Sequence, residues 1–387
     1  MTPSSVHEAR LGIPRPRQSC HSAVMTGLAA ALDVLPKVEL HCHIEGAMRP
    51  ATVVELARAN RIPLPTEDPT ELYRYDSLDG FLDVFWLVQS TLCTRADWTR
   101  LAYEAVLDSA AHGVVHQECF FTPTRHLVAG QDLGDIVAGL DEGIAAAEEE
   151  SRSTCLLIGD MDRAFGPAAG RDLVEELAGL RRAGAPGAER VIGVGMDSTE
   201  LGIDSTTFLP GYDLARSAGF RLTGHQGENS SASDIAACLD VLGLQRIDHG
   251  VPVLDDVDLA ARMADEQIPI TVCPTSNVVI ARYFDRLEDH VYPDMRAAGL
   301  LATVNTDDPA LTDLNLGQEY AAVARAFEYT WDDMVQIALD GVEACWLPDS
   351  DKDALRRRII EAGTTLRPDD DSNAWAGRPT QVRLQER

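Results

Sequence analysis

The sequence predicts an α/β protein of the (β/α)₈ TIM-barrel class, with a helical insertion after the first strand. Short β-rich apolar runs alternate with longer helical segments, eight such units fit into about 270 residues, and polar side chains gather at the ends of the runs. Strands that alternate with helices form a parallel sheet, and eight units are the number that closes a barrel.

The eight predicted strands are short runs rich in Val, Ile, Thr and Phe. They begin at Lys37, Val114, Thr154, Arg190, Arg221, Arg246, Ile268 and Ala302. Between them lie segments such as IVAGLDEGIAAAEEE and DLVEELAGLRRA, with apolar residues at helical spacing. The stretch from about Ala51 to Ala111 is too long for one crossover helix. We expect it to be a helical insertion over the barrel mouth, with Phe81, Phe85 and Trp86 as pocket walls or as packed core.

The domain organisation follows from this pattern. Residues 25–366 are expected to form a single barrel domain. Residues 1–24 are polar and lack the apolar centre of a signal peptide, so they are expected to be a disordered arm, and translation could start at Met1 or at Met25. The segment 367–387 is expected to be a disordered tail.

Composition excludes several function classes. A net charge of −29 argues against nucleic acid and anionic membrane as partners, and it favours a small neutral substrate. We find no apolar run long enough for a membrane span. The eight cysteines are scattered without a C-x-x-C pair, which favours a reducing, cytoplasmic compartment over a disulfide framework. A homo-oligomer is compatible with the sequence, which does not fix the oligomeric state.

Polar residues at the strand ends are expected to meet at one mouth of the barrel, where active sites of this fold lie. They are His41, His43, His225, Glu228, His249, Asn277, Asp307 and Asp308.

The H-x-H pair formed by His41 and His43 is the first sign of a metal site. Residues i and i+2 of a strand point to the same side, so both imidazoles can reach one ion, and His225 and Asp307 are the natural further ligands. Cys42, between them, should point away into the core. The chain has two lysines, Lys37 and Lys352, and neither is placed to reach the mouth. A single ion is therefore favoured over a lysine-bridged pair, and zinc fits these ligands.

The remaining mouth residues suggest proton chemistry. Glu228 can donate a proton to a substrate or shuttle one from water, and His249 can hold and deprotonate that water. The consecutive acids Asp307 and Asp308 cannot both bind the ion comfortably, so one of them should face the substrate.

The motifs LPKVELHCHIEG, GHQGE, RIDHG, CPTSNV and VNTDDPA, spread over roughly residues 35 to 345, resemble the adenosine and adenine deaminase family. The resemblance implies one Zn²⁺ per chain on His41, His43, His225 and Asp307. It also implies attack of water on C6 of a 6-aminopurine and loss of ammonia. It assigns Glu228 as proton donor to N1, His249 as the base that orients hydroxide, Asp308 as acceptor near N7, and Gly195 as a backbone contact to N3.

Within that family, Glu45 and the segment GMDSTELG, which contains Ser198, resemble the adenine deaminase branch, whereas Thr122 and Gln226 depart from its pattern. Adenine, adenosine and a modified 6-aminopurine therefore stay open as substrates. Two other classes also stay open. A one-metal ester or lactone hydrolase would need a cation such as Arg125 for its anion, and a non-catalytic purine-binding protein would need only the pocket.

Overall fold

The structure is a computed structural model that describes residues 27–75 and 78–368. The predicted N-terminal arm lies outside the described residues, and so does the predicted tail from residue 369 onward.

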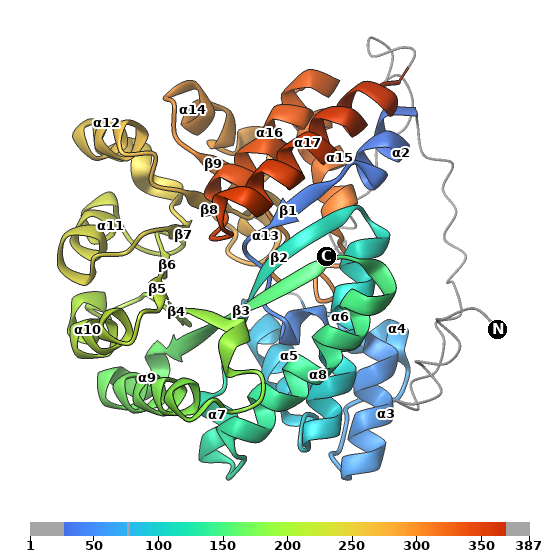
Figure 1. Cartoon of the computed structure of the whole chain (residues 1–387), viewed down its shortest axis with the longest axis vertical. Helices are drawn as coiled ribbons and strands as arrows, with labels where there is room; N and C mark the ends of the chain where they lie inside the picture. Colours follow the sequence, from blue (N-terminus) through green and yellow to red (C-terminus); the bar gives the residue numbers. More distant parts are fainter. Residues whose placement is uncertain (1–26, 76–77, 369–387) are drawn as a thin grey trace.

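Parallel strands form the centre of the described chain (Figure 1). They are β1 (Lys37–Glu39), β2 (Val114–Phe121), β3 (Thr154–Asp162), β4 (Val191–Asp197), β5 (Arg221–Leu222), β6 (His225–Gln226), β7 (Ile247–His249), β8 (Ile270–Val272) and β9 (Ala302–Val304). β5 and β6 belong to one chain segment, interrupted at Thr223 and Gly224. Its first part pairs with β4 and its second part with β7, so the segment joins the two sheets.

The first and last strands also meet. Beyond β1 and β9 the chain continues as a parallel bridge between Cys42 and Asp307. The His43 amide donates to the Asp307 carbonyl at 2.8 Å, and the Asp307 amide donates to the His41 carbonyl at 3.0 Å. We call this contact the seam. Each of the eight predicted runs contains a strand, and the predicted barrel class is confirmed.

Helices surround the strands (Figure 1). Those that follow β2 are α7 (Thr124–Val128), α8 (Leu133–Ser151), α9 (Gly166–Ala183), α10 (Leu209–Ser217), α11 (Ala232–Ala237), α12 (Val257–Asp265), α13 (Pro274–Val279), α14 (Tyr292–Ala297), α15 (Leu316–Ala326), α16 (Trp331–Ala344) and α17 (Asp349–Thr365). α9 illustrates the packing: it buries Leu173, Val174 and Leu177, which share one helical face. A Cβ at Gly159 of β3 would lie 2.8 Å from Leu177, so this strand glycine lets the helix approach closely.

The segment between β1 and β2 is helical, and α2 (Gly27–Val34) precedes β1. The segment consists of η1 (Glu45–Ala47), α3 (Pro50–Asn60), α4 (Pro69–Leu72), α5 (Leu78–Ser90) and α6 (Arg95–Ala111). On α5, the rings of Phe81 and Phe85 stack at 5.9 Å and are both buried. The Phe85 ring also lies 6.4 Å from the His43 ring. α5 therefore contributes both to the core and to the surroundings of the H-x-H pair.

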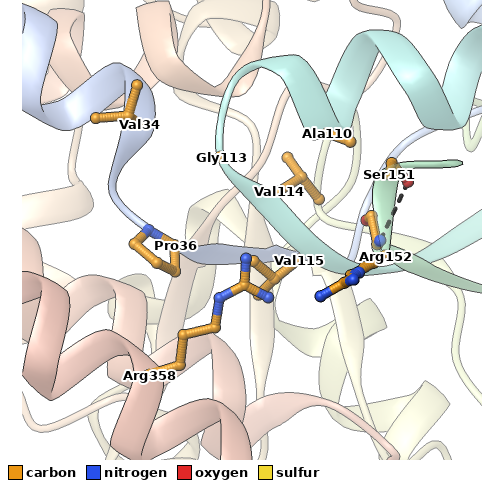
Figure 2. A pocket seen from close by; sticks show the side chains of 10 residues that line it. Val34, Pro36, Ala110, Gly113, Val114, Val115, Ser151, Arg152 and Arg358 are labelled. Carbon is orange, nitrogen blue, oxygen red and sulfur yellow. Dashed lines mark hydrogen bonds between the residues drawn. The ribbon is translucent and has the colours of Figure 1, made fainter. Parts of the chain in front are cut away.

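The amino-terminal ends of the strands hold a small cavity of about 60 Å³ (Figure 2). It is lined by Pro36, Val114 and Ser153 among others, residues at or just before the starts of β1, β2 and β3. The Lys37 ammonium donates to the His112 carbonyl at 2.6 Å, and Lys352 donates to the Glu343 carbonyl at 2.7 Å. Both lysines are thus engaged away from the His and Asp residues at the strand ends.

Among the residues that the structure describes, we find no helix that is long and apolar enough to cross a membrane.

Candidate active site

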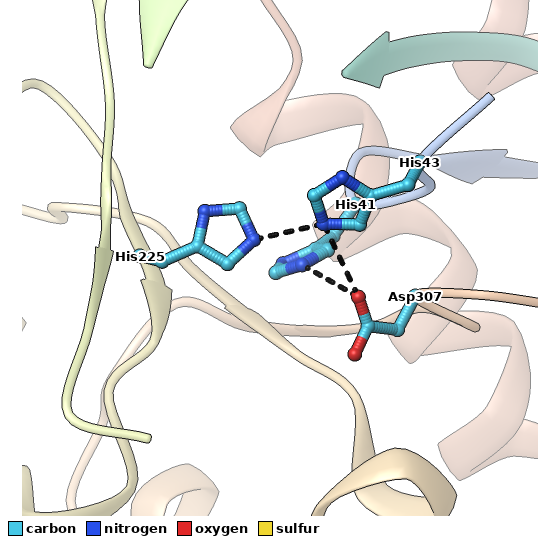
Figure 3. A group of neighbouring side chains, drawn as sticks. All are labelled: His41, His43, His225 and Asp307. Carbon is cyan, nitrogen blue, oxygen red and sulfur yellow. Dashed lines mark hydrogen bonds and ion pairs between the residues drawn. The ribbon is translucent and has the colours of Figure 1, made fainter. Parts of the chain in front are cut away.

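Three histidines and one aspartate meet at the carboxyl ends of the strands (Figure 3). His41 and His43 follow β1, His225 begins β6, and Asp307 follows β9. Each offers one ligand atom, and these four atoms lie within 4.8 Å of one another. The Asp307 Oδ1 atom is 3.2 Å from His41 Nε2 and 3.4 Å from His43 Nε2, and His43 Nε2 is 3.0 Å from His225 Nε2. We call these four residues the ligand cluster.

The hydrogen bonds behind the ligand cluster fix which ring nitrogens face it. His225 Nδ1 lies 3.1 Å from the Met196 carbonyl, which can only accept, so the His225 proton is on Nδ1. His41 Nδ1 lies 3.0 Å from the Thr271 hydroxyl, which itself donates to Asp248 and therefore accepts from His41. Both Nε2 atoms thus present lone pairs to the cluster. Such outer partners are typical of metal-binding histidines.

The donor set fits a metal cation. Burial lowers the pKa of His43 to about 3, so its ring is neutral and able to act as a ligand. Asp307 is oriented by the Ser276 hydroxyl, which donates to its other oxygen, Oδ2, at 2.6 Å. Two imidazole lone pairs facing a third histidine and a carboxylate at these distances repel one another unless a cation lies between them. Imidazole nitrogens with one carboxylate oxygen are ligands that zinc accepts.

Three residues at the strand ends have backbone angles that L-residues rarely adopt. Ser198, His249 and Asp307 have φ of 71°, 69° and 67°. The left-handed region is unfavourable for residues with a Cβ, and such residues concentrate at functional sites.

Glu228 lies in the loop after β6, and Glu200 holds that loop. Glu200 is buried and accepts hydrogen bonds from the Gly227 amide at 2.9 Å, the Glu228 amide at 3.0 Å and the Gln226 side chain at 3.1 Å. The Ser230 hydroxyl also donates to it. Burial raises the pKa of the half-buried Glu228.

Asp308 follows Asp307 in the chain and is buried. A Cβ at Gly46 would lie 1.9 Å from Asp308 Oδ1, so only glycine leaves room for this carboxyl group. Burial, and then repulsion by Asp307 and Glu45, raises the pKa of Asp308 well above its ordinary value. Glu45 accepts from the Thr122 amide at 2.9 Å, and burial raises its pKa to about 7.

Two further buried carboxyl groups, Asp160 on β3 and Asp197 on β4, lie beside His43. The Thr122 hydroxyl donates to Asp197 at 2.5 Å, whereas neither carboxyl oxygen of Asp160 has a hydrogen-bond partner among the described residues. Burial, together with nearby carboxylates, raises the pKa of both groups well above the ordinary range. A Cβ at Gly195 would lie 2.0 Å from Asp160, so Gly195 leaves the space that this carboxyl group occupies.

His249 ends β7, and its ring lies 4.7 Å from the His41 ring and 5.3 Å from the His225 ring. Its Nδ1 atom is 3.2 Å from Asn277 Nδ2. Asn277 Oδ1 is in turn 3.1 Å from His290 Nε2, and His290 Nδ1 accepts from the Tyr292 amide at 2.9 Å. Asn277 lies on α13 rather than in a strand, so it stands behind His249 instead of in the ligand cluster.

The other predicted residues take different places. Ser198 is half-buried after β4, where Arg163 donates to its carbonyl at 3.1 Å. Trp86 is covered by the guanidinium of Arg125, 3.4 Å from its ring, and Arg125 pairs with Asp162 at 3.3 Å. Cys42 is buried core, as predicted.

Gln226 is also placed away from the ligand cluster. Its side chain bonds to Ser205 at 2.8 Å and to Ser230 at 2.6 Å, on the opposite side of β6 from His225. This departure from the adenine deaminase pattern therefore lies away from the ligand cluster.

A barrel with histidines and an aspartate clustered at its strand ends defines the class: a metal-dependent hydrolase of the amidohydrolase type. The family model described as adenosine deaminase matches residues 36–362. The chain belongs to the adenosine deaminase family, and its activity is the hydrolytic deamination of an aminopurine, a reaction at the carbon–nitrogen bond of a cyclic amidine.

Individual relatives agree with this membership. Adenine deaminase of Streptomyces coelicolor is 36% identical over 334 residues, which cover 85% of this chain and 95% of that protein. The crystal structure of adenine deaminase from Arthrobacter aurescens superposes with a TM-score of 0.79 at 34% identity, covering 85% of this chain and 99% of that one. An amidohydrolase from Burkholderia ambifaria with bound zinc gives 0.82 at 30% identity, covering 92% and 97%.

Several residues of this site escaped the sequence analysis. Asp160 is embedded in an apolar run. Glu200 lies in a loop segment in which only Ser198 was predicted to be a site residue. His290 belongs to the connection between η7 (Leu287–Asp289) and α14, which carries no motif. The available signal was local: GMDSTE places Asp197 at a strand end, by the same rule that singled out the other mouth residues.

Proposed function

We propose that this chain is a zinc-dependent adenine deaminase that binds one ion per chain through His41, His43, His225 and Asp307. The observation that carries the proposal is the convergence of this ligand cluster with Glu228 and Asp308 at one barrel mouth. The zinc-containing relative supports the choice of metal, and the relatives named adenine deaminase support the choice of substrate.

The residues divide the chemistry among them. A zinc ion at the ligand cluster would act as a Lewis acid that lowers the pKa of a water molecule toward ~7. Glu228 delivers a proton to purine N1, so that C6 accepts the oxygen and the C6–N bond can break with release of ammonia. His249 orients the attacking water, and Asp308 accepts a hydrogen bond near N7.

Other residues of the mouth are assigned to substrate binding. Glu45, Ser198 and the backbone of Gly195 border the purine, and Phe85 and Trp86 close the mouth from α5. Phe85 already lies against His43, whereas Trp86 reaches the site through Arg125.

The electrostatics favour a base over a nucleotide. Asp160, Asp197 and Asp308 are buried carboxyl groups, and none of them offers a phosphate a positive charge. Arg125 is held by Asp162, and Arg163 donates to the carbonyl groups of Ser198 and His225. An ester or lactone hydrolase would need a free cation for its anionic product, so this arrangement also disfavours that class.

The test compares the deamination of adenine and of adenosine by zinc-loaded protein, with metal-free protein as the control, by following purine absorbance and ammonia. Turnover of adenine at least 100-fold above that of adenosine is the expected result. Preferential turnover of adenosine or of an N6-substituted purine would contradict the choice of adenine but keep the deaminase chemistry. Tight purine binding without ammonia release would instead indicate a binding protein.

Glu200→Gln is expected to lower kcat by about 10- to 100-fold and to change KM by less than about threefold, because misplacing a catalytic group affects the chemical step most. The amide that replaces one carboxylate oxygen would face the backbone N–H of Gly227 or Glu228, donor against donor. Steady-state kinetics with measured zinc content check this expectation.

Asp204→Asn is the matched control, because it removes one negative charge from the same loop. Asp204 is exposed and accepts from Thr206 rather than from residues 226–230. Equal kcat values for Glu200→Gln and Asp204→Asn would show that Glu200 does not position Glu228.

A further inference from the structure

We infer that Asn277 and His290 hold the His249 ring with its proton on Nε2, so that His249 donates a hydrogen bond to the attacking water and does not act as its base. The inference rests on the proposed function, because it concerns the water that attacks the purine. Asn277 and His290 are positioning residues in this scheme.

The Tyr292 backbone amide has a hydrogen-bond direction that is fixed by covalent structure, because an N–H can only donate. The Tyr292 N–H donates to His290 Nδ1 at 2.9 Å, so Nδ1 carries a lone pair. His290 is buried, and burial lowers its pKa to about 3, so the ring is neutral and its proton lies on Nε2. That N–H points to the Asn277 side chain at 3.1 Å.

His290 therefore decides the orientation of the Asn277 amide. An N–H donor requires the oxygen Oδ1 opposite it, whereas the reversed amide would place two donors against each other. With Oδ1 on His290, the Asn277 Nδ2 group points to His249 Nδ1 at 3.2 Å. Nδ2 can only donate, so His249 Nδ1 must accept, and the ring proton of His249 lies on Nε2.

This tautomer leaves an N–H at His249 Nε2, the ring nitrogen that does not bond to Asn277. A donor stabilises the negative charge that develops on the attacking oxygen, but it cannot remove a proton from the water. We assign that proton to the Glu228 carboxylate, which passes it to purine N1. Oxygen adds to C6, the hydroxyl proton of this adduct is transferred to the amino group, the C6–N bond breaks, and ammonia leaves with C6=O and N1–H in the product. One carboxyl group therefore serves as base and then as acid, with no net proton uptake by His249.

Asn277→Asp tests this scheme with almost no change of shape. A carboxylate accepts from His290 and also from His249, so it favours a proton on His249 Nδ1 and moves the lone pair to Nε2. Zinc-loaded wild-type and Asn277→Asp proteins are assayed with adenine across the same pH series, and kcat is compared on the alkaline plateau of each profile. The expected result is a fall in kcat of at least 100-fold, with zinc content retained and KM within about threefold.

An unchanged or raised kcat in Asn277→Asp would overturn the inference. If His249 were the base, Asn277→Asp would place the required lone pair on Nε2, and kcat would be maintained or raised. Asn315→Asp is the matched control: Asn315 accepts from the Gln318 amide at the start of α15, a position that Asp fills equally well. Its kcat is expected to stay within twofold of the wild-type value.

A second measurement needs neither turnover nor a folded Asn277→Asp variant. The ¹⁵N spectrum of histidine-labelled wild-type protein distinguishes protonated from unprotonated ring nitrogens, and His249→Gln identifies one ring among the ten histidines of the chain. A proton on Nε2 is expected, and a proton on Nδ1 would overturn the inference. Wild-type protein that shows the Nε2 tautomer but does not deaminate adenine would contradict the proposed function alone.

Discussion

Glu228→Gln is expected to lower kcat for deamination roughly 10²- to 10⁴-fold, the range in which general acid–base catalysis contributes. Gln keeps the size of the side chain but has no proton to deliver to purine N1. The backbone amide of residue 228 keeps its bond to Glu200, so the loop should stay in place. Steady-state kinetics with adenine and zinc content by elemental analysis provide the measurement.

The control for this variant is Glu189→Gln, because Glu189 is exposed in η3 (Ala188–Arg190). It should retain full activity, and both variants should bind zinc and unfold at the wild-type temperature. Activity of Glu228→Gln within threefold of wild type would rule out the proton-donor role.

Removal of a ligand should have a still larger effect. Asp307→Ala is expected to lose zinc and all measurable deamination, because the carboxylate is the one anionic ligand and its neighbours His41 and His43 then face each other without charge compensation. Chelation of wild-type zinc should lower the temperature of thermal unfolding, since an ion that binds only the folded chain stabilises it. Elemental analysis, calorimetry and kinetics check these expectations together.

Cys42→Ala tests whether any substitution at the seam causes the loss of zinc and activity that is expected of Asp307→Ala. Cys42 lies between two ligands but is buried in the core, so its loss should cost stability and leave zinc bound. Retention of stoichiometric zinc by Asp307→Ala would show that the ion is held elsewhere.

The barrel was predictable because its signals are local and repeated. Each strand is a short apolar run, and each run ends in polar residues that the fold brings to one mouth. The ligand cluster follows from the same rule: His41, His43, His225 and Asp307 lie at strand ends, and the structure places their ligand atoms within 4.8 Å of one another.

What the sequence did not predict depends on contacts between distant segments. Asn277 is in a run that resembles a strand end, yet α13 begins there at Pro274. The Asn277 side chain therefore lies on a helix and contacts His249 and His290. Strand alternation puts the Gln226 side chain opposite His225, where it bonds to Ser205 and Ser230. Glu200 makes its hydrogen bonds to residues 226–230, which are distant in the sequence, so no local motif predicts them.

The seam makes completion of the ligand cluster depend on the part of the barrel that is synthesised last. His41 and His43 leave the ribosome early, and Asp307 arrives only after the barrel strands that lie between them. Because Asp307 bonds through its backbone to the segment that carries both histidines, the last strand joins the first in the same step that completes the ligand cluster. A nascent or truncated chain that ends before β9 therefore lacks both closure and the anionic ligand. We therefore expect tight metal binding only in chains that have finished folding.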